Sequence, residues 1–288
     1  MRTRDRKRSR KWGVLAQSVR GAAHYRMEKP NQDAVEWFPV SESGPPLIVA
    51  VSDGHGSSKS FRSDRGARFA VNVAVAELKA LLAALPDTAS EVRSAAETRL
   101  PGAIVQAWER RISEDIAAEP FSPKERKNFI AQYSAPAWKV LKANPLVAYG
   151  ATLLVAAATN DYLFLAQIGD GDIVTVTRAG CATRPFRQDP RLFAGETTSL
   201  CLADAVESFT VLVHEMKEEV PALVLLSTDG YANSFEDDGG FLSVGSDLLM
   251  MLREHDTAAV QRDLETWLEE ASREGSGDDI TLGVLCLL

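Results

Sequence analysis

The chain has 288 residues, of which 45% are hydrophobic and 25% charged, and it carries a formal net charge of −8 at neutral pH. This composition is typical of a soluble globular protein and excludes a disordered or fibrous one. The apolar runs, such as "ATLLVAAAT", are far shorter than the roughly 20 residues that cross a bilayer, so we expect no membrane span.

The N-terminal segment differs in charge from the rest of the chain. Residues 1–11 carry seven basic side chains and one acidic side chain, a charge of +6, so the remaining chain carries −14. Such a run can touch nucleic acid, an anionic membrane or an acidic partner, but a solvated, flexible tail is the more ordinary outcome. The acidic body argues against a nucleic-acid partner.

Cysteine usage indicates a reducing compartment. Cys181, Cys201 and Cys286 are few, odd in number and without CxxC spacing, which argues against a disulfide framework or a thiolate metal site. The basic N-terminus is not followed by the apolar stretch of a secretion signal. We therefore predict a cytoplasmic protein.

The first half of the chain predicts strands and then helices. Residues 12–20 and 33–40 predict short strands around a polar turn, and residues 46–52 predict a buried strand. A helical block follows over residues 60–142. It is longer than covering a sheet requires, which leaves a docking role open.

Within this block we expect three helical segments. The first ends before Pro86, the second covers about 90–118 with an interruption near Pro101, and the third covers about 122–142. The stretch "SPKER" suits the start of the third helix, because serine caps a helix and proline fits its first turn.

The second half is rich in strands. The runs "GATLLVAAAT", "DYLFLAQIG" and "DIVTVTRAG" predict an antiparallel meander, and "ESFTVLVHEM" and "PALVLLS" predict two further strands. Helices at about 241–254 and 257–273 precede a terminal strand. We therefore predict a single α+β domain over residues 12–288, an antiparallel β-sandwich flanked by helices on both faces.

Four aspartates stand at the ends of predicted strands: Asp53, Asp170, Asp229 and Asp278. Each has an ordinary explanation, because Asp-Gly is a common turn dipeptide. If they gathered at one end of a sheet, their repulsion would be costly unless cations lay between them. Mg²⁺ and Mn²⁺ prefer such oxygen ligands, and two of them about 4 Å apart are a standard device for phosphoryl transfer to water.

Six motifs resemble, in order, those of the metal-dependent protein phosphatases, the PP2C or PPM family, in its bacterial branch. They are "NQDAV" (31–35), "VSDGHG" (51–56), "YGATLL" (149–154), "AQIGDGDIVTV" (166–176), "LLSTDGYANSF" (225–235) and "GSGDDITLGVL" (275–285). Any one motif is weak evidence, but six in order over nearly the whole chain make a strong signal.

The resemblance implies a site with two Mn²⁺ or Mg²⁺ ions. Asp53 would bridge both ions, with the Gly54 carbonyl completing one coordination shell. Asp229 and Asp278 would hold the second ion, and Asp170 matches the position of a third, weaker one.

The resemblance also implies a mechanism. A water activated by the two metals would attack phosphorus in line, and Asp33 would orient that water from outside the metal shell. His55 would protonate the departing serine or threonine oxygen, a role for which its near-neutral pKa suits it, whereas the plain alternative is a turn histidine bonded to water.

The chain departs from the family pattern in three places. Glu28 stands where many members have a phosphate-binding arginine, so His24 or Arg26 becomes the candidate, or each is simply a surface residue. Asp279 replaces a usual asparagine, where it would tighten metal binding or face solvent. The acidic segment at about 230–241 matches a variable flap, and its charge would favour basic substrates or only solvation.

These residues predict hydrolysis of phosphoserine or phosphothreonine on a phosphoprotein, opposing a cognate kinase. Two alternatives use the same fold: a pseudophosphatase that binds phosphoprotein without turnover, and a phosphatase of a small phosphorylated metabolite. The intact Asp53, Asp229, Asp278 and His55 argue against the first, and the displaced arginine is its only support.

Overall fold

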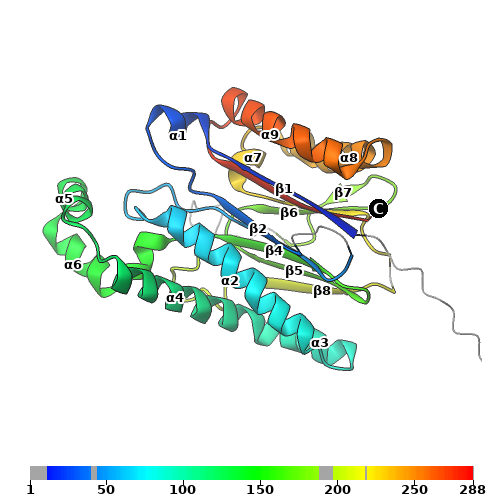
Figure 1. Ribbon diagram of the computed structural model, residues 1–288, viewed down its shortest axis with the longest axis horizontal. Helices are drawn as coiled ribbons and strands as arrows, with labels where there is room; N and C mark the ends of the chain where they lie inside the picture. The colour runs from blue at the N-terminus through cyan, green and yellow to red at the C-terminus, as the bar shows by residue number, and fades with distance from the viewer. Residues whose placement is uncertain (1–11, 40–43, 188–196, 218, 288) are drawn as a thin grey trace, which may run out of the picture.

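Two antiparallel sheets packed face to face form the centre of the molecule, with helices on both outer faces (Figure 1). The computed structural model describes residues 12–39, 44–187, 197–217 and 219–287, so the predicted basic tail at 1–11 lies outside the described residues. The prediction of an α+β sandwich flanked by helices is confirmed.

The first sheet has the strand order β1-β10-β9-β6-β7. These strands are β1 (Trp12–Val19), β10 (Ile280–Leu287), β9 (Leu223–Ser227), β6 (Asp172–Val176) and β7 (Ala182–Thr183). The last strand of the sequence, β10, therefore lies between the first strand and β9, with register pairs such as Ala16 with Gly283.

The second sheet has the order β2-β3-β4-β5-β8. Its strands are β2 (Ala34–Phe38), β3 (Leu47–Ser52), β4 (Leu153–Ala158), β5 (Tyr162–Ile168) and β8 (Thr210–Glu215). Strand β3 is buried along its whole length, because Val49 and Val51 face the first sheet while Ile48 and Ala50 face the helices. Coverage of both faces explains why this strand reads as a continuous apolar run.

Helices cover the second sheet from outside. They are α2 (Ser63–Ala83), α3 (Ala89–Thr98), α4 (Leu100–Ala118), α5 (Pro123–Gln132) and α6 (Ala135–Ala143), followed by the 3-10 turn Pro145–Tyr149. Trp108 is fully buried and donates its indole N–H to the Gly66 carbonyl at 3.0 Å, which fixes α4 against α2.

The outer face of the first sheet carries α8 (Asp238–Glu254) and α9 (Thr257–Glu274) (Figure 1). Two short helices, α1 (Ala22–Arg26) and α7 (Asp229–Ala232), lie near the ends of strands. The predicted flap at 230–241 comprises α7, a turn and the start of α8, with Tyr231 and Phe241 buried. No helix among the described residues is both long and apolar enough to span a bilayer.

Strand order differs from the prediction in one region. The predicted meander is wrong, because β4 and β5 pair with each other but β6 crosses to the first sheet and pairs with β9. The crossing follows Gly169, whose φ of +110° lies in a region that glycine adopts readily, and β8 takes the place beside β5. A local pattern of strands and turns does not fix the partner of each strand.

Helical boundaries also differ at one point. The single helix predicted over 122–142 is two helices, because Tyr133 ends α5 and the Ser134 side chain caps α6 by accepting a hydrogen bond from the Ala137 amide at 3.1 Å.

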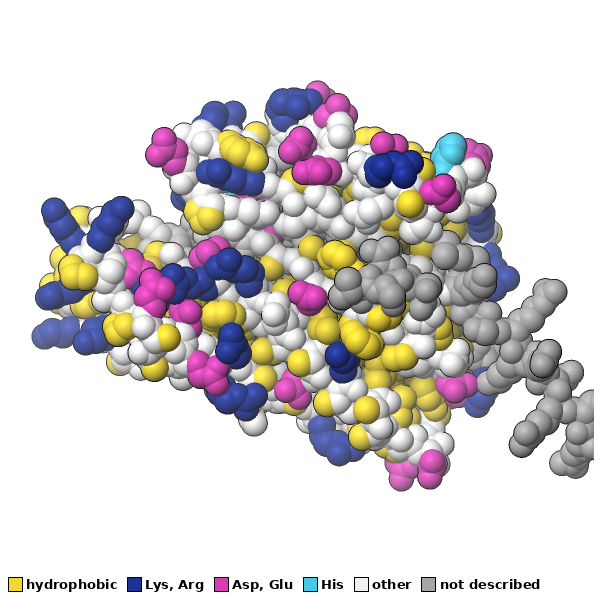
Figure 2. Space-filling model, in the orientation of Figure 1, with side chains coloured by type: hydrophobic (Ala, Val, Ile, Leu, Met, Phe, Trp, Pro, Cys, Tyr) yellow, Lys and Arg dark blue, Asp and Glu magenta, His cyan; other side chains and the backbone are white. Residues whose placement is uncertain are grey.

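Basic side chains gather over α5 and α6 in Figure 2, whereas the chain as a whole is acidic.

A buried arginine joins α5 to the start of α2. Arg62 is 3% exposed and donates hydrogen bonds to the Glu125 carboxylate at 2.7 Å and the Tyr149 hydroxyl at 2.8 Å. Glu125 also closes a capping box with Ser122. Because Arg62 is buried, losing Glu125 would leave its charge without this partner, so the pair holds α5 to the segment between "VSDGHG" and α2.

Candidate active site

Carboxylates from distant parts of the sequence gather at one end of the sandwich. Asp53 follows β3, and the surrounding protein desolvates it, which raises its pKa well above the usual range. The charges of four further aspartates raise it more: Asp33, Asp229, Asp170 and Asp278. The structure therefore brings the five predicted aspartates into one cluster.

Asp229 shows the same electrostatic conflict. Its pKa is raised to about 6: burial is the largest cause, the charges of Asp170 and Asp278 also raise it, and a hydrogen bond with the Asp53 carboxyl opposes them. A group of carboxylates that repel one another in this way fits divalent cations, whose charge reverses the repulsion. The donor set of the site thus fits the expected metals.

Gly54 brings its backbone close to two other segments. Its N–H donates to the Gln32 carbonyl at 3.1 Å, and a Cβ at this position would lie 2.6 Å from the carbonyl oxygens of Gln32 and Ser63. Only glycine fits without a backbone shift, so the glycine after Asp53 is required by packing.

Asp33 lies at the start of β2, with its side chain buried. Its Oδ2 accepts a hydrogen bond from the Thr228 hydroxyl at 2.8 Å, and the Thr228 oxygen in turn accepts one from the Thr281 amide at 2.9 Å. Burial raises the pKa of Asp33 well above its usual range, and the charge of Asp279 is the next cause. Thr228 therefore ties Asp33 to β9 and β10.

His55 is held by a residue that the sequence does not single out. Its Nε2 lies 2.7 Å from the Ser199 Oγ, and Ser199 donates its own proton to the Ala151 carbonyl at 3.0 Å. Nε2 therefore carries the proton shared with Ser199. Burial lowers the pKa of His55, and the nearby Asp170 charge partly opposes this.

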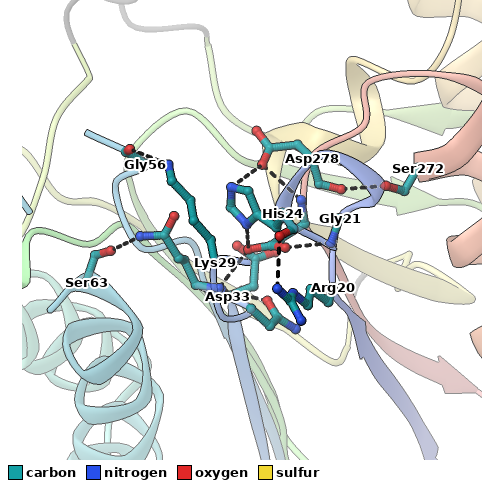
Figure 3. A network of polar contacts seen from close by, with 12 residues as sticks. Arg20, Gly21, His24, Lys29, Asp33, Gly56, Ser63, Ser272 and Asp278 are labelled. Atoms are coloured by element: carbon teal, nitrogen blue, oxygen red, sulfur yellow. Dashed lines mark hydrogen bonds and ion pairs between the residues drawn. The ribbon is translucent and has the colours of Figure 1, made fainter. Parts of the chain in front are cut away.

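Asp279 is buried rather than exposed to solvent. It is 4% exposed, and its carboxylate accepts hydrogen bonds from the amides of Gly21 and Gln32, both at 2.6 Å, and from His24 Nδ1 at 2.8 Å (Figure 3). The carboxylate thereby joins the start of β10 to both ends of the segment between β1 and β2. The alternative prediction that Asp279 faces solvent is therefore wrong.

The two candidate phosphate-binding residues lie in different surroundings. His24 is 6% exposed, and its Nε2 lies 3.8 Å from Asp278 Oδ1. Arg26 is exposed, and its guanidinium lies beside Gly277, next to Asp278. Across the part of the chain that the structure describes, the ligating atoms of His24, Asp278 and Asp279 form the one such trio within 4.8 Å of one another.

Comparison with known proteins now decides the family. The family model described as protein phosphatase 2C matches residues 20–269, which is most of the chain. The chain belongs to the protein phosphatase 2C family. It is by family a serine/threonine protein phosphatase, and the family is metal-dependent. No curated protein sequence is significantly similar to it.

Solved structures share the fold of this protein phosphatase 2C member at low identity. The Mycobacterium tuberculosis serine/threonine phosphatase PstP is 18% identical with a TM-score of 0.55, and the match covers 96% of this chain and 99% of that one. A separate structure of the PstP catalytic domain contains two manganese ions.

Two other bacterial structures are similar. PppA, a regulatory component of the T6SS in Pseudomonas aeruginosa, is 19% identical with a TM-score of 0.58, over 96% of this chain and 98% of that one. The S. agalactiae serine/threonine phosphatase is 18% identical with a TM-score of 0.57, over 96% of this chain and 100% of that one. At these identities the likeness shows the phosphatase 2C fold alone.

Proposed function

We propose that the protein removes phosphate from phosphoserine and phosphothreonine of a phosphoprotein, in opposition to a cognate kinase. The observation that carries this proposal is the cluster of five aspartates, in which burial and then the neighbouring charges raise the pKa values of Asp53 and Asp229. Such a cluster is costly for the protein alone and suits a hydrolytic site that binds cations.

Asp53, the Gly54 carbonyl, Asp229 and Asp278 would hold two Mn²⁺ or Mg²⁺ ions, and Asp170 a third. When bound, the cations lower the pKa of water and neutralise charge on the phosphoryl oxygens. Asp170 already accepts a hydrogen bond from the Thr197 hydroxyl at 2.6 Å, which leaves its other oxygen available. The two manganese ions of the PstP structure support the cation number.

Two side chains would handle the protons. Asp33 hydrogen-bonds with the side chains of Thr228 and Thr281, which hold its carboxyl in place to orient the attacking water. His55 shares its Nε2 proton with Ser199, and a proton carried on Nδ1 would pass to the departing serine or threonine oxygen.

Arg26 would bind the substrate phosphate from the side of Asp278. Its guanidinium is exposed beside Gly277, and arginine can donate two parallel hydrogen bonds to a phosphate. His24 was the other candidate for this role, but its ring lies against two carboxylates, which disfavours direct contact with a phosphate anion.

We place this activity in the cytoplasm. All three cysteines are free, with Cys201 and Cys286 buried and Cys181 exposed, a pattern that suits a reducing compartment.

The test is a comparison of substrates and metals. A phosphoserine peptide, a small aryl phosphate and a nucleotide are assayed with and without Mn²⁺, for the native protein, Asp229→Asn and the exposed control Asp263→Asn. We expect metal-dependent hydrolysis of the peptide, a loss of about a thousandfold or more in Asp229→Asn, and no loss in the control.

Three results would contradict the proposal. Full activity in Asp229→Asn, or without metal, would exclude the cation site. Turnover of nucleotides but not of peptides would favour a metabolite phosphatase. Binding of a phosphopeptide without turnover of any phosphoester would favour a pseudophosphatase.

A further inference from the structure

We propose that His24 is a ligand of the metal centre through Nε2, beside Asp278, and that Asp279 positions it. This inference rests on the proposed metal centre and adds a nitrogen donor to a set otherwise made of oxygen atoms. The ring belongs to α1, a single helical turn between β1 and β2 (Figures 1 and 3).

The ring of His24 is fixed before any metal binds. The Ala22 amide donates to the Ser272 hydroxyl at 3.0 Å, the Ala23 amide donates to the Gly277 carbonyl at 2.8 Å, and Arg20 donates to the His24 carbonyl at 2.9 Å. These contacts attach α1 to the segment that carries Asp278. The backbone of α1 is therefore held in place, and the hydrogen bond from Nδ1 to Asp279 orients the ring.

The hydrogen bond to Asp279 sets the tautomer. A carboxylate that already accepts two backbone amide protons is an acceptor for Nδ1 as well, so Nδ1 carries the proton. In the neutral ring the lone pair is then on Nε2. Histidines that bind metals usually donate their other N–H to a carboxylate in this way, which fixes the ring and strengthens the donor.

The Nε2 atom is aimed at a predicted metal ligand. It lies 3.8 Å from Asp278 Oδ1, beyond hydrogen-bond distance, and makes no hydrogen bond to another described residue. Two donors with bonds of about 2.1 Å to one cation lie roughly 3–4 Å apart, so the separation fits a shared ion. The His24 side chain is 8% exposed and that of Asp278 is 56% exposed, and Asp278 Oδ1 is oriented by a hydrogen bond from the Asp279 amide at 2.9 Å.

A nitrogen donor changes the expected metal preference. Imidazole suits transition metals, whereas Mg²⁺ prefers carboxylate, carbonyl and water oxygens. We therefore expect this site to favour Mn²⁺ over Mg²⁺ more strongly than a site of oxygen donors alone, and we expect the preference to depend on His24.

The first experiment measures the contact directly. The full chain is loaded with Mn²⁺ and examined by pulsed electron paramagnetic resonance, with ¹⁴N and with ¹⁵N-labelled histidine. We expect a histidine nitrogen coupling that changes with the isotope, that is lost in His24→Gln, and that persists in His55→Gln and in the remote, exposed His255→Gln.

The second experiment measures affinity by calorimetry with Mn²⁺ or Mg²⁺ alone, so it needs no turnover. We expect His24→Gln to weaken Mn²⁺ binding by at least about tenfold and Mg²⁺ binding by less. The His255→Gln variant should match the native protein for both metals. Circular dichroism checks that each variant is folded.

The outcomes separate this inference from the proposed function. Binding of Mn²⁺ without a histidine coupling in the native protein, or a coupling lost only in His55→Gln, overturns the role of His24 and leaves the metal centre in place. A native protein that binds no Mn²⁺ overturns both. If His24→Gln does not fold, the native and His55→Gln spectra still decide: a native protein without the coupling, or its loss in His55→Gln, overturns the role of His24.

Discussion

The buried His24 and the half-buried His55 border the same group of aspartates, and their partners differ. His24 donates to the carboxylate of Asp279, whereas His55 shares its proton with the hydroxyl of Ser199. A carboxylate partner makes an imidazole a stronger donor toward a cation, while a neutral hydroxyl leaves the burial of His55 to lower its pKa. The residue type alone would not distinguish the proposed metal ligand, His24, from the proposed proton donor, His55, but the hydrogen-bond partner of each ring does.

The largest effect should come from His55. His55→Ala should lower kcat/KM on a phosphoserine peptide by about a hundredfold to ten-thousandfold, because proton donation to a poor leaving group is lost. An aryl phosphate, whose leaving group needs little protonation, should lose less. Calorimetry should show unchanged Mn²⁺ affinity, and a weakened affinity would break the contrast with His24.

The aspartates between the two histidines should make the metal-free protein sensitive to pH. The pKa values of Asp53 and Asp229 are raised in the folded state, to about 6 for Asp229, so the folded chain binds more protons than the unfolded one between about pH 4 and 6. Stability without metal should therefore fall as pH rises through this window.

Thermal unfolding with and without Mn²⁺ measures this effect. We expect the increase in Tm caused by Mn²⁺ to be larger at pH 7 than at pH 5, by about 5 °C. At pH 7 the carboxylates are ionised and repel one another, and the cation offsets this repulsion. Chelation at pH 7 should reverse the gain. An equal increase at both pH values would mean that the carboxylates do not repel one another as the structure indicates.

Asp279→Asn should have an intermediate effect. The amide keeps the shape of the carboxylate but loses its charge and one of its acceptor oxygens, so the His24 ring is less firmly oriented. Mn²⁺ affinity should fall by about tenfold to a hundredfold, measured by calorimetry, with a smaller change for Mg²⁺. Asp263→Asn is the matched control, and equal losses for both metals would speak against a role through His24.

Ser199→Ala should have the smallest effect. It removes one hydrogen bond from His55, a contact that contributes about 1 kcal/mol, so kcat on the phosphoserine peptide should fall by about tenfold or less. Mn²⁺ affinity should not change. A loss as large as that of His55→Ala would show that Ser199 acts on the substrate itself.

The sequence predicts the carboxylate cluster because each aspartate follows or precedes an apolar strand. Strand ends gather at the two ends of a sandwich, so residues far apart in sequence, such as Asp53 and Asp229, come close together. The predicted residue ranges of most helices also agree with the structure, because helical spacing and caps are local signals.

Other features depend on contacts that no local pattern encodes. Ser199 lies in a stretch without regular periodicity, and its role becomes visible only when the fold places it beside His55. Thr228 reads as an ordinary strand-end residue until Asp33 lies beside it. The crossing of β6 to the first sheet likewise depends on which strand offers the better partner across the core.

The place of β10 between β1 and β9 has a consequence for how the protein forms during synthesis. The strand enters between β1 and β9, and the segment just before it supplies Asp278 and Asp279. Contacts this far apart in sequence form late, because a long stretch of chain must be ordered to close them. A nascent chain whose β10 is still inside the ribosome therefore lacks the strand that joins β1 to β9 and one side of the proposed ion-binding site. Enzymatic competence would thus arrive together with the closing of the sheet, so partly made chains would not act on phosphoproteins.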